Sequence, residues 1–198
     1  MQVTRRTSKT YVLVATAVMS TIAIIADILP LPRVVWGMKI DLVGTVWVLS
    51  FFLYGWRSAL TVAAITAIYI AAFSTTGYVG AVMKFIATTP MFLVPAAMVY
   101  TPFFKRKESR AYGSVLVIVA AAVIASIVRL LLATTVNLYW AIPIWFGMTP
   151  DQVLAYFGGV IPLVVFVAGM NVAQGAVDIL IPWTLAFKLR LCRYFGTW

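Results

Sequence analysis

Long runs of apolar residues, separated by short polar or charged links, make up almost the whole chain. A membrane-spanning helix needs about 20 predominantly apolar residues, and six runs reach or approach that length. The second and third runs are shorter than an upright crossing requires. The pattern predicts an all-α membrane protein, a bundle of six transmembrane helices forming a single domain over residues 1–198. The expected spans are 10–29, 40–54, 58–73, 81–100, 113–134 and 163–189.

Composition supports the same class of protein. Hydrophobic residues make up 64% and charged residues 10% of the 198-residue chain, whereas globular proteins average about 45–50% and about 25%. The first apolar run is too long for the core of a cleaved signal peptide, so we expect it to be retained as a span. The chain is therefore predicted to be a multi-pass protein of the cell membrane, surrounded by the lipid bilayer.

The basic residues are distributed unevenly over the links between the apolar runs. In a soluble protein, a net charge of +10 would suggest a nucleic-acid partner. Here most of the charge falls on one side of the expected bundle, and cytoplasmic links are enriched in Lys and Arg. This side, with both termini, is predicted to be cytoplasmic, and no nucleic-acid partner is expected. It holds Arg5, Arg6, Lys9, Arg57, Lys105, Arg106, Lys107, Arg110, Lys188, Arg190 and Arg193, against Arg33, Lys39, Lys84 and Arg129 elsewhere.

Several catalytic and metal-binding chemistries lack the residues that they require. The chain has one cysteine and no histidine, which leaves no disulfide, no thiolate cluster for a metal and no imidazole base. We find no phosphate-binding loop and no paired acid and base, so we expect no catalytic residues, no metal and no cofactor. Two other classes stay open. A small membrane enzyme would need a carboxylate cluster or a nucleophile–base pair, and a channel or scaffold would lack a small-molecule pocket.

One aromatic segment, residues 136–148, lies between the last two long apolar runs. Pro143 and Gly147 indicate that it is not a helix. Its rings gather beside an amide that can both donate and accept hydrogen bonds. Two interpretations fit this pattern, an interfacial aromatic belt or the lid of a site for a planar, polar-edged small molecule. The residues concerned are Asn137, Tyr139, Trp140, Trp145 and Phe146.

Polar side chains also occur inside the apolar runs, where a charge is costly unless it faces a cavity or a partner. Asn171 and Gln174 are three residues apart and share one helical face near mid-membrane. At a rise of about 1.5 Å per residue along a helix, a second group of polar residues is expected in the outer third of the membrane. We expect a pocket open to the outside, although snorkelling cations and interhelical hydrogen bonds would also explain single residues. The second group comprises Asp27, Asp41, Lys84, Arg129 and Asn137.

Two acidic residues, Asp41 and Asp178, carry separate expectations. Asp41 opens the second run, either as a helix cap or as a carboxylate facing the cavity. Lys39, two residues earlier, ends a short link that we expect at the membrane surface. Asp178 follows Gln174 by one turn, and Arg129 is expected to lie too far towards the outer surface to be its partner.

Four motifs in order resemble those of a known family. They are Lys39-Ile-Asp41-Leu, the stretch from Met83 to Pro95 with Tyr100, Asn137-x-Tyr139-x-x-x-Pro143, and Asn171-Val-Ala-Gln174-Gly175. Together they resemble the substrate-binding S-components of energy-coupling factor (ECF) vitamin transporters, particularly the riboflavin-specific ones. In that family a lysine is usual at the position of Gln174, and an alanine-x-x-x-alanine pair is usual in the first span.

The resemblance implies a six-helix bundle that captures a vitamin from outside. Such a subunit delivers the vitamin through a complex with a transmembrane coupling subunit and two ATPase subunits. It implies riboflavin as the transported ligand, with thiamine, biotin or pantothenate as alternatives. Contact with the coupling subunit is implied at Ala17 and Thr21, the nearest substitute for the alanine pair. The expected ligand-binding residues are Asp41, Lys84, Asn137, Tyr139, Trp140, Trp145, Asn171 and Gln174.

Overall fold

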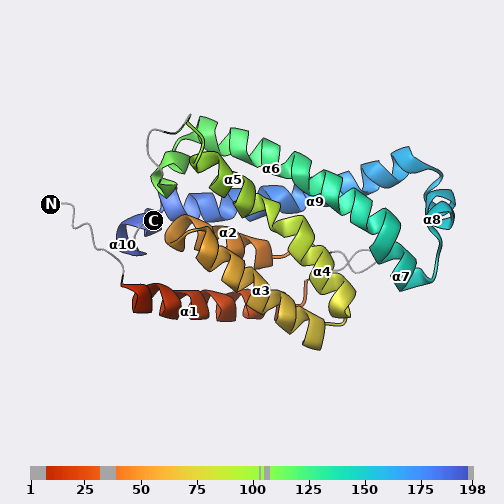
Figure 1. Cartoon of the computed structure of the whole chain (residues 1–198), viewed down its shortest axis with the longest axis horizontal. Coiled ribbons are helices and arrows are strands. Elements are labelled where there is room, and N and C mark those ends of the chain that lie inside the picture. The colour runs from red at the N-terminus through yellow and green to blue at the C-terminus, as the bar shows by residue number, and fades with distance from the viewer. Residues whose placement is uncertain (1–7, 32–38, 103, 105–107, 196–198) are drawn as a thin grey trace.

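The regular elements in the described part of the chain are all helices. The computed structural model describes residues 8–31, 39–102, 104 and 108–195, and Figure 1 shows their arrangement. The helices are α1 (Lys9–Ile28), α2 (Val43–Tyr54), α3 (Trp56–Phe73), α4 (Gly77–Thr88), α5 (Pro90–Val99), a 3-10 turn (Ser109–Gly113), α6 (Val115–Val136), a π-helical turn (Asn137–Ala141), α7 (Ile142–Phe146), α8 (Pro150–Phe157), α9 (Val160–Trp183), a second π-helical turn (Thr184–Lys188) and α10 (Leu191–Phe195).

Five helical stretches are long and apolar enough to cross a membrane. They are Lys9–Ile28, Trp56–Phe73, Gly77–Val99, Val115–Phe146 and Val160–Lys188. They confirm the prediction of an all-α, multi-pass membrane protein. The predicted span 40–54 is an apolar helix of only 12 residues, α2, which at 1.5 Å per residue is about 18 Å long against a hydrocarbon core of about 30 Å.

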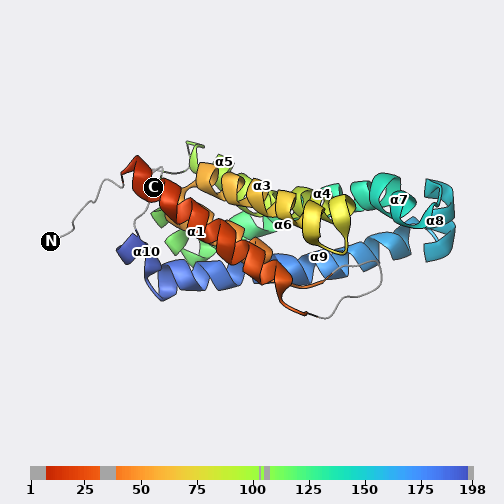
Figure 2. The same ribbon diagram turned by 90° about the horizontal axis from the view of Figure 1, so that it is seen from below.

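The short helix α2 lies at the centre of the bundle. It packs against α1, α3 and α9, and Figures 1 and 2 show it enclosed by longer helices. Its sequence is apolar on every side, as expected of a helix that is buried all round, and Trp47, Phe51 and Phe52 have no exposed surface. Residues just before α2 contact Gln174 near the middle of α9. The helix therefore begins about halfway along the bundle and does not extend into the other half.

The predicted span 81–100 consists of two helices joined at a proline. Pro90 has no N–H group and cannot continue the hydrogen-bond pattern of α4, so α4 ends at Thr88 and α5 begins at Pro90. The Thr89 hydroxyl donates to the Phe85 carbonyl oxygen at 2.5 Å. This break brings Thr88, with no exposed surface, to the inside of the bundle.

The aromatic segment is helical, so our prediction that Pro143 and Gly147 exclude a helix is wrong. A π-helical turn follows α6, and the Ile142 N–H donates to the Asn137 carbonyl oxygen five residues earlier. This wider turn directly before Pro143 changes the backbone spacing at the point where a proline would break an α-helix. The helix ends at Gly147, whose φ of 62° is left-handed. Figure 1 shows α7 and α8 at the end of the bundle opposite α10.

Candidate functional site

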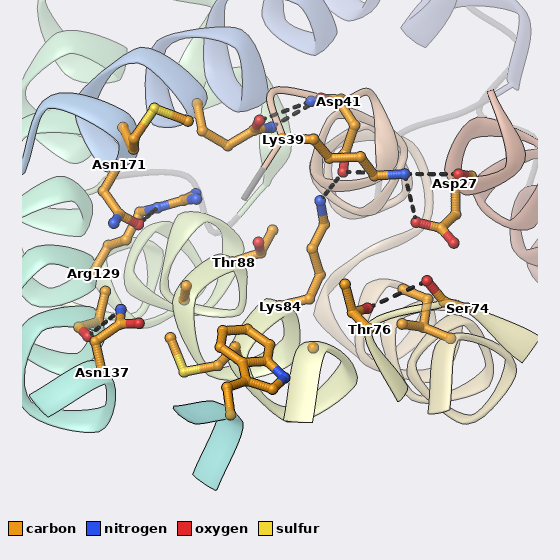
Figure 3. Close-up of a pocket in the computed structure, with 18 residues that line it drawn as sticks. Asp27, Lys39, Asp41, Ser74, Thr76, Lys84, Thr88, Arg129, Asn137 and Asn171 are labelled. Carbon is orange, nitrogen blue, oxygen red and sulfur yellow. Dashed lines mark hydrogen bonds and ion pairs between the residues drawn. The ribbon is translucent and has the colours of Figure 1, made fainter. Parts of the chain in front are cut away.

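A pocket lies in the half of the bundle that α2 does not reach. Its empty volume is about 770 Å³, a figure that includes the open space at its mouth. Its walls come from α3, α4, α6, α9 and the residues that precede α2 (Figure 3). Six of the eight predicted ligand-binding residues line it: Asp41, Lys84, Asn137, Trp145, Asn171 and Gln174.

The other two predicted residues, Tyr139 and Trp140, lie outside the pocket lining. The Tyr139 side chain is 66% exposed on the bundle surface. Trp140 packs edge-on against Tyr78 with ring centroids 6.4 Å apart. Of the three aromatic residues that we expected to stack on a ligand, only Trp145 is placed where it can do so.

Asp41 faces the cavity, and its side chain also supports the start of α2, although Leu42 is the capping residue. Its Oδ1 accepts a hydrogen bond from the Val43 N–H at 3.0 Å and so satisfies a backbone donor at the start of α2. Its Oδ2 accepts from the Lys84 ammonium, which reaches across from α4. The carboxylate is buried, and Asp41 and Lys84 both line the pocket. One side chain thus fixes the beginning of α2 and one charged wall of the cavity.

The amide of Gln174 is occupied by protein groups. Its Oε1 accepts from the Asp41 N–H at 2.9 Å, and its Nε2 donates to the Asp41 carbonyl oxygen at 2.9 Å and to Asp178 Oδ1 at 2.7 Å. Both of its N–H donors are therefore used. Gln174 lines the pocket, but its geometry is that of a link between α9 and the start of α2.

A second ion pair closes the pocket beside α1. The Lys39 ammonium lies 2.9 Å from Asp27 Oδ1 and donates to the Asp27 carbonyl oxygen at 2.7 Å. It also lies 4.0 Å from Asp41 Oδ2. From the sequence we expected Lys39 in a surface link, yet its side chain is only 7% exposed. The signal that we overlooked is the spacing Lys39-Ile-Asp41, which puts two opposite charges on one side of an extended stretch.

Arg129 pairs with Asp178, which corrects our expectation that the two lie at different depths. Arg129 Nη1 donates to Asp178 Oδ2 at 2.8 Å, and both side chains are buried. The expectation failed because it placed the end of the span at residue 134. The helix continues to Phe146, so Arg129 lies near its middle and faces the middle of α9.

The two predicted asparagines keep spare hydrogen-bonding capacity on the pocket wall. Asn171 accepts from Arg129 Nε at 2.8 Å and donates to the Val167 carbonyl oxygen at 2.9 Å. Asn137 donates to the Ala133 carbonyl oxygen at 2.8 Å. A side-chain amide has two N–H groups and two acceptor sites. Each asparagine can therefore still donate one hydrogen bond and accept at least one.

Every charge around the pocket has a partner of opposite sign. The three pairs are Lys39–Asp27, Lys84–Asp41 and Arg129–Asp178. The site as a whole is therefore neutral, and a charged guest would leave one charge unbalanced in a buried place. Among the described residues, no group of three or more His, Cys, Asp or Glu side chains could hold a metal ion. The arrangement can bind an uncharged polar molecule through amides, hydroxyls and one indole ring.

Thr88 lines the pocket and was absent from our predicted site. Its hydroxyl oxygen is buried and has no hydrogen-bond partner among the described residues. Threonine is common in membrane helices, so its presence alone carried no signal. The following Thr89-Pro90 pair could have indicated that the helix breaks here and turns its last residues inward.

Comparison with known proteins identifies a family and a similar fold. The sequence model of the family described as "ECF transporter, substrate-specific component" matches residues 12–187. A solved structure of the S component of a bacterial ECF transporter has a similar fold, with a TM-score of 0.70 and 20% sequence identity. The match covers 92% of this chain and 97% of that one. No protein of curated function matches the sequence significantly.

Proposed function

The chain belongs to the ECF transporter substrate-specific component family, and on this premise we propose that it captures riboflavin from outside the cell for uptake. Members of this family are substrate-binding subunits of transporters and not enzymes. The substrate-specific role is thus given by the family, and riboflavin is our assignment within it. ATP would be hydrolysed by partner subunits, because the sequence contains no phosphate-binding loop.

The observation that carries the assignment is a neutral pocket with two partly free amides. The isoalloxazine ring system of riboflavin is flat and uncharged, and its imide edge both donates and accepts hydrogen bonds. Asn137 and Asn171 can each do the same towards a guest, and Trp145 offers a face for stacking. We assign ligand-binding roles to these three residues and to Asp41 and Lys84.

The charge balance also supports riboflavin over the alternatives. Thiamine carries a fixed positive charge, and biotin and pantothenate carry a carboxylate at neutral pH. Each would add an uncompensated charge to a site whose three cations already have carboxylate partners, and burying such a charge is costly. We therefore rank these three vitamins below riboflavin.

We further propose that the chain is a single domain, residues 1–198, that crosses the cell membrane six times with both termini in the cytoplasm. The sixth crossing would be α2 together with the residues that precede it. In Figures 1 and 2, α1 begins at the end of the bundle where α10 lies, and the excess of Lys and Arg supports a cytoplasmic position for that end. Of the basic residues counted, Arg5, Arg6, Arg33, Lys105, Arg106 and Lys107 lie outside the described residues.

A titration of riboflavin with the purified protein tests the function. Flavin fluorescence should be quenched when the ring stacks against Trp145 and leaves water. Competition with thiamine, biotin and pantothenate should have no effect. Unquenched riboflavin at micromolar protein would contradict the assignment, and displacement by one of the other vitamins would replace it.

Alanine at either asparagine should weaken riboflavin binding. Asn137→Ala and Asn171→Ala each remove hydrogen bonds to a buried ligand, worth about 1–3 kcal/mol. Riboflavin titration of each variant measures the loss. Val172→Ala is the matched control, because Val172 is next to Asn171 on α9 but 58% exposed on the outer surface. Affinity unchanged in both asparagine variants would remove these residues from the site.

We propose that the outer face of α1 docks on the coupling subunit of a complex that also contains two ATPase subunits. Ala17 and Thr21 are exposed on this face and are linked by a hydrogen bond from the Thr21 hydroxyl to the Ala17 carbonyl oxygen at 3.2 Å. Small residues four apart let a second helix approach closely.

A bulky residue on this face should block assembly. Ala17→Leu should reduce the coupling subunit recovered with the tagged chain about tenfold, since membrane helix contacts of this kind are worth about 1–2 kcal/mol. Riboflavin affinity should not change, because Ala17 lies away from the pocket lining. Val18→Leu is the control, as Val18 is 53% exposed and already large. Equal recovery with both variants would place the contact elsewhere.

A further inference from the structure

Arg129 is a buried guanidinium whose donors are only partly used. It is 4% exposed. A guanidinium carries five N–H groups, and two of these are engaged, by Asn171 Oδ1 and Asp178 Oδ2. The other three have no hydrogen-bond partner among the described residues. These three donors are free to pair with an acceptor on a guest in the pocket.

The unused donors face the pocket. Arg129 belongs to the pocket lining, whereas its ion-pair partner Asp178 does not. In Figure 3 the guanidinium extends from α6 towards the side of the hollow where Thr88 and Lys84 lie. The two engaged hydrogen bonds hold the planar group in one orientation. Its remaining edge is therefore fixed before any guest arrives, and such preorganisation lowers the cost of binding.

A second unsatisfied group lines the same hollow. The Thr88 hydroxyl, on α4, has no hydrogen-bond partner among the described residues, and Thr88 has no exposed surface. Buried polar side chains in proteins nearly always have a partner. Beside the unused donors of Arg129 on α6, α4 thus contributes a second unmet hydrogen-bonding group, which neighbouring atoms cover.

We propose that Arg129 and Thr88 contact the substrate directly, and that Arg129 donates to a carbonyl oxygen of its imide edge beside Asn171. This inference rests on the proposed function. Asp178 keeps the guanidinium neutralised, so the contact suits an uncharged carbonyl and needs no anionic guest. The Arg129–Asp178 pair accordingly acts as a fixed hydrogen-bond donor for a neutral substrate. Together with the two asparagines, it would make the site specific for substrates that carry carbonyl groups.

Two conservative variants test the contacts. Thr88→Val removes the hydroxyl but keeps the shape, and Arg129→Lys keeps the charge beside Asp178 but loses the planar set of donors. Each should weaken riboflavin binding about 10- to 100-fold, as expected for losing a buried hydrogen bond to a ligand. Thr134→Val is the control. The Thr134 hydroxyl is likewise buried without a partner among the described residues, but Thr134 is not part of the pocket lining.

A comparison of ligands separates a direct contact from an indirect effect of Arg129 on Asn171. Riboflavin with sulfur in place of one imide oxygen, at C2 or at C4, accepts hydrogen bonds poorly. The unaltered protein should bind one of the two thio-analogues about tenfold more weakly than riboflavin, and Arg129→Lys should lose this discrimination. Size-exclusion chromatography in detergent checks that each variant is folded.

The outcomes distinguish this inference from the proposed function. Suppose that the unaltered protein binds riboflavin, that Thr88→Val leaves the affinity unchanged, and that Arg129→Lys weakens the binding of riboflavin and of both thio-analogues equally. The direct contacts are then overturned, and the proposed function stands. If the unaltered protein does not bind riboflavin, the function and these contacts fail together.

Discussion

Asp178→Asn should destabilise the folded protein by about 3–5 kcal/mol, the usual cost of removing one partner from a buried ion pair. The substitution keeps the size of the side chain but leaves the Arg129 guanidinium, 2.8 Å away, without its compensating charge. Water screens this pair little, since Asp178 has no exposed surface and Arg129 only 4%. Thermal unfolding in detergent, followed by the loss of the monomer peak, measures the effect.

Removing both charges provides the control for this experiment. The double variant Arg129→Met/Asp178→Asn has no isolated charge, and exchanging a whole buried pair for neutral groups is often close to neutral for stability. It should recover most of the stability that Asp178→Asn loses. If the double variant unfolds as early as the single one, the ion pair is not the cause of the loss.

Gly44→Ala should have the second-largest effect on stability, about 3 kcal/mol. A Cβ atom at Gly44, on α2, would lie 2.6 Å from Asp178 Oδ2 and closer still to Oδ1. The carboxylate cannot move away without breaking its hydrogen bonds to Arg129 and Gln174. Overpacking alone costs about 1–3 kcal/mol, and disturbing a buried ion pair adds to that. The same thermal unfolding assay reports the loss.

A glycine with free space around it is the matched control. Gly169 lies in α9, and a Cβ atom there would meet nothing within 4 Å. Gly169→Ala should leave stability unchanged or raise it slightly, because alanine favours helices over glycine by up to about 1 kcal/mol. Equal stability of the two alanine variants would show that α2 and α9 have room between them at Gly44.

The elements with a strong apolar pattern could be predicted from the sequence. Five long runs correspond to helical stretches long enough to cross a membrane, because hydrophobic length is the dominant constraint on a chain in lipid. The position of the polar side chains along these runs also predicted which would converge. Six of eight expected residues line one pocket, although their binding role stays a prediction.

The predictions that were wrong relied on the usual effect of a single residue on the backbone, which the surrounding structure overrides. Pro143 usually ends a helix, but the π-helical turn before it lets the chain continue. That error also misplaced the end of the span and hid the partnership of Arg129 with Asp178. Tyr139 and Trp140 were expected in the pocket but lie outside its lining, since the sequence does not give the rotation of the helix and so does not say which way each ring faces.

The polar links at mid-height of the bundle limit how the helices can move. Gln174 holds α9 to the start of α2, and Asp178 holds α9 to α6. If α9 slid by one turn, about 5.4 Å, all of these bonds would break at once with no replacement in the lipid. These bonds therefore fix the three helices in a single register. If the bundle changed its tilt in the membrane, α2, α6 and α9 would move together as one rigid body.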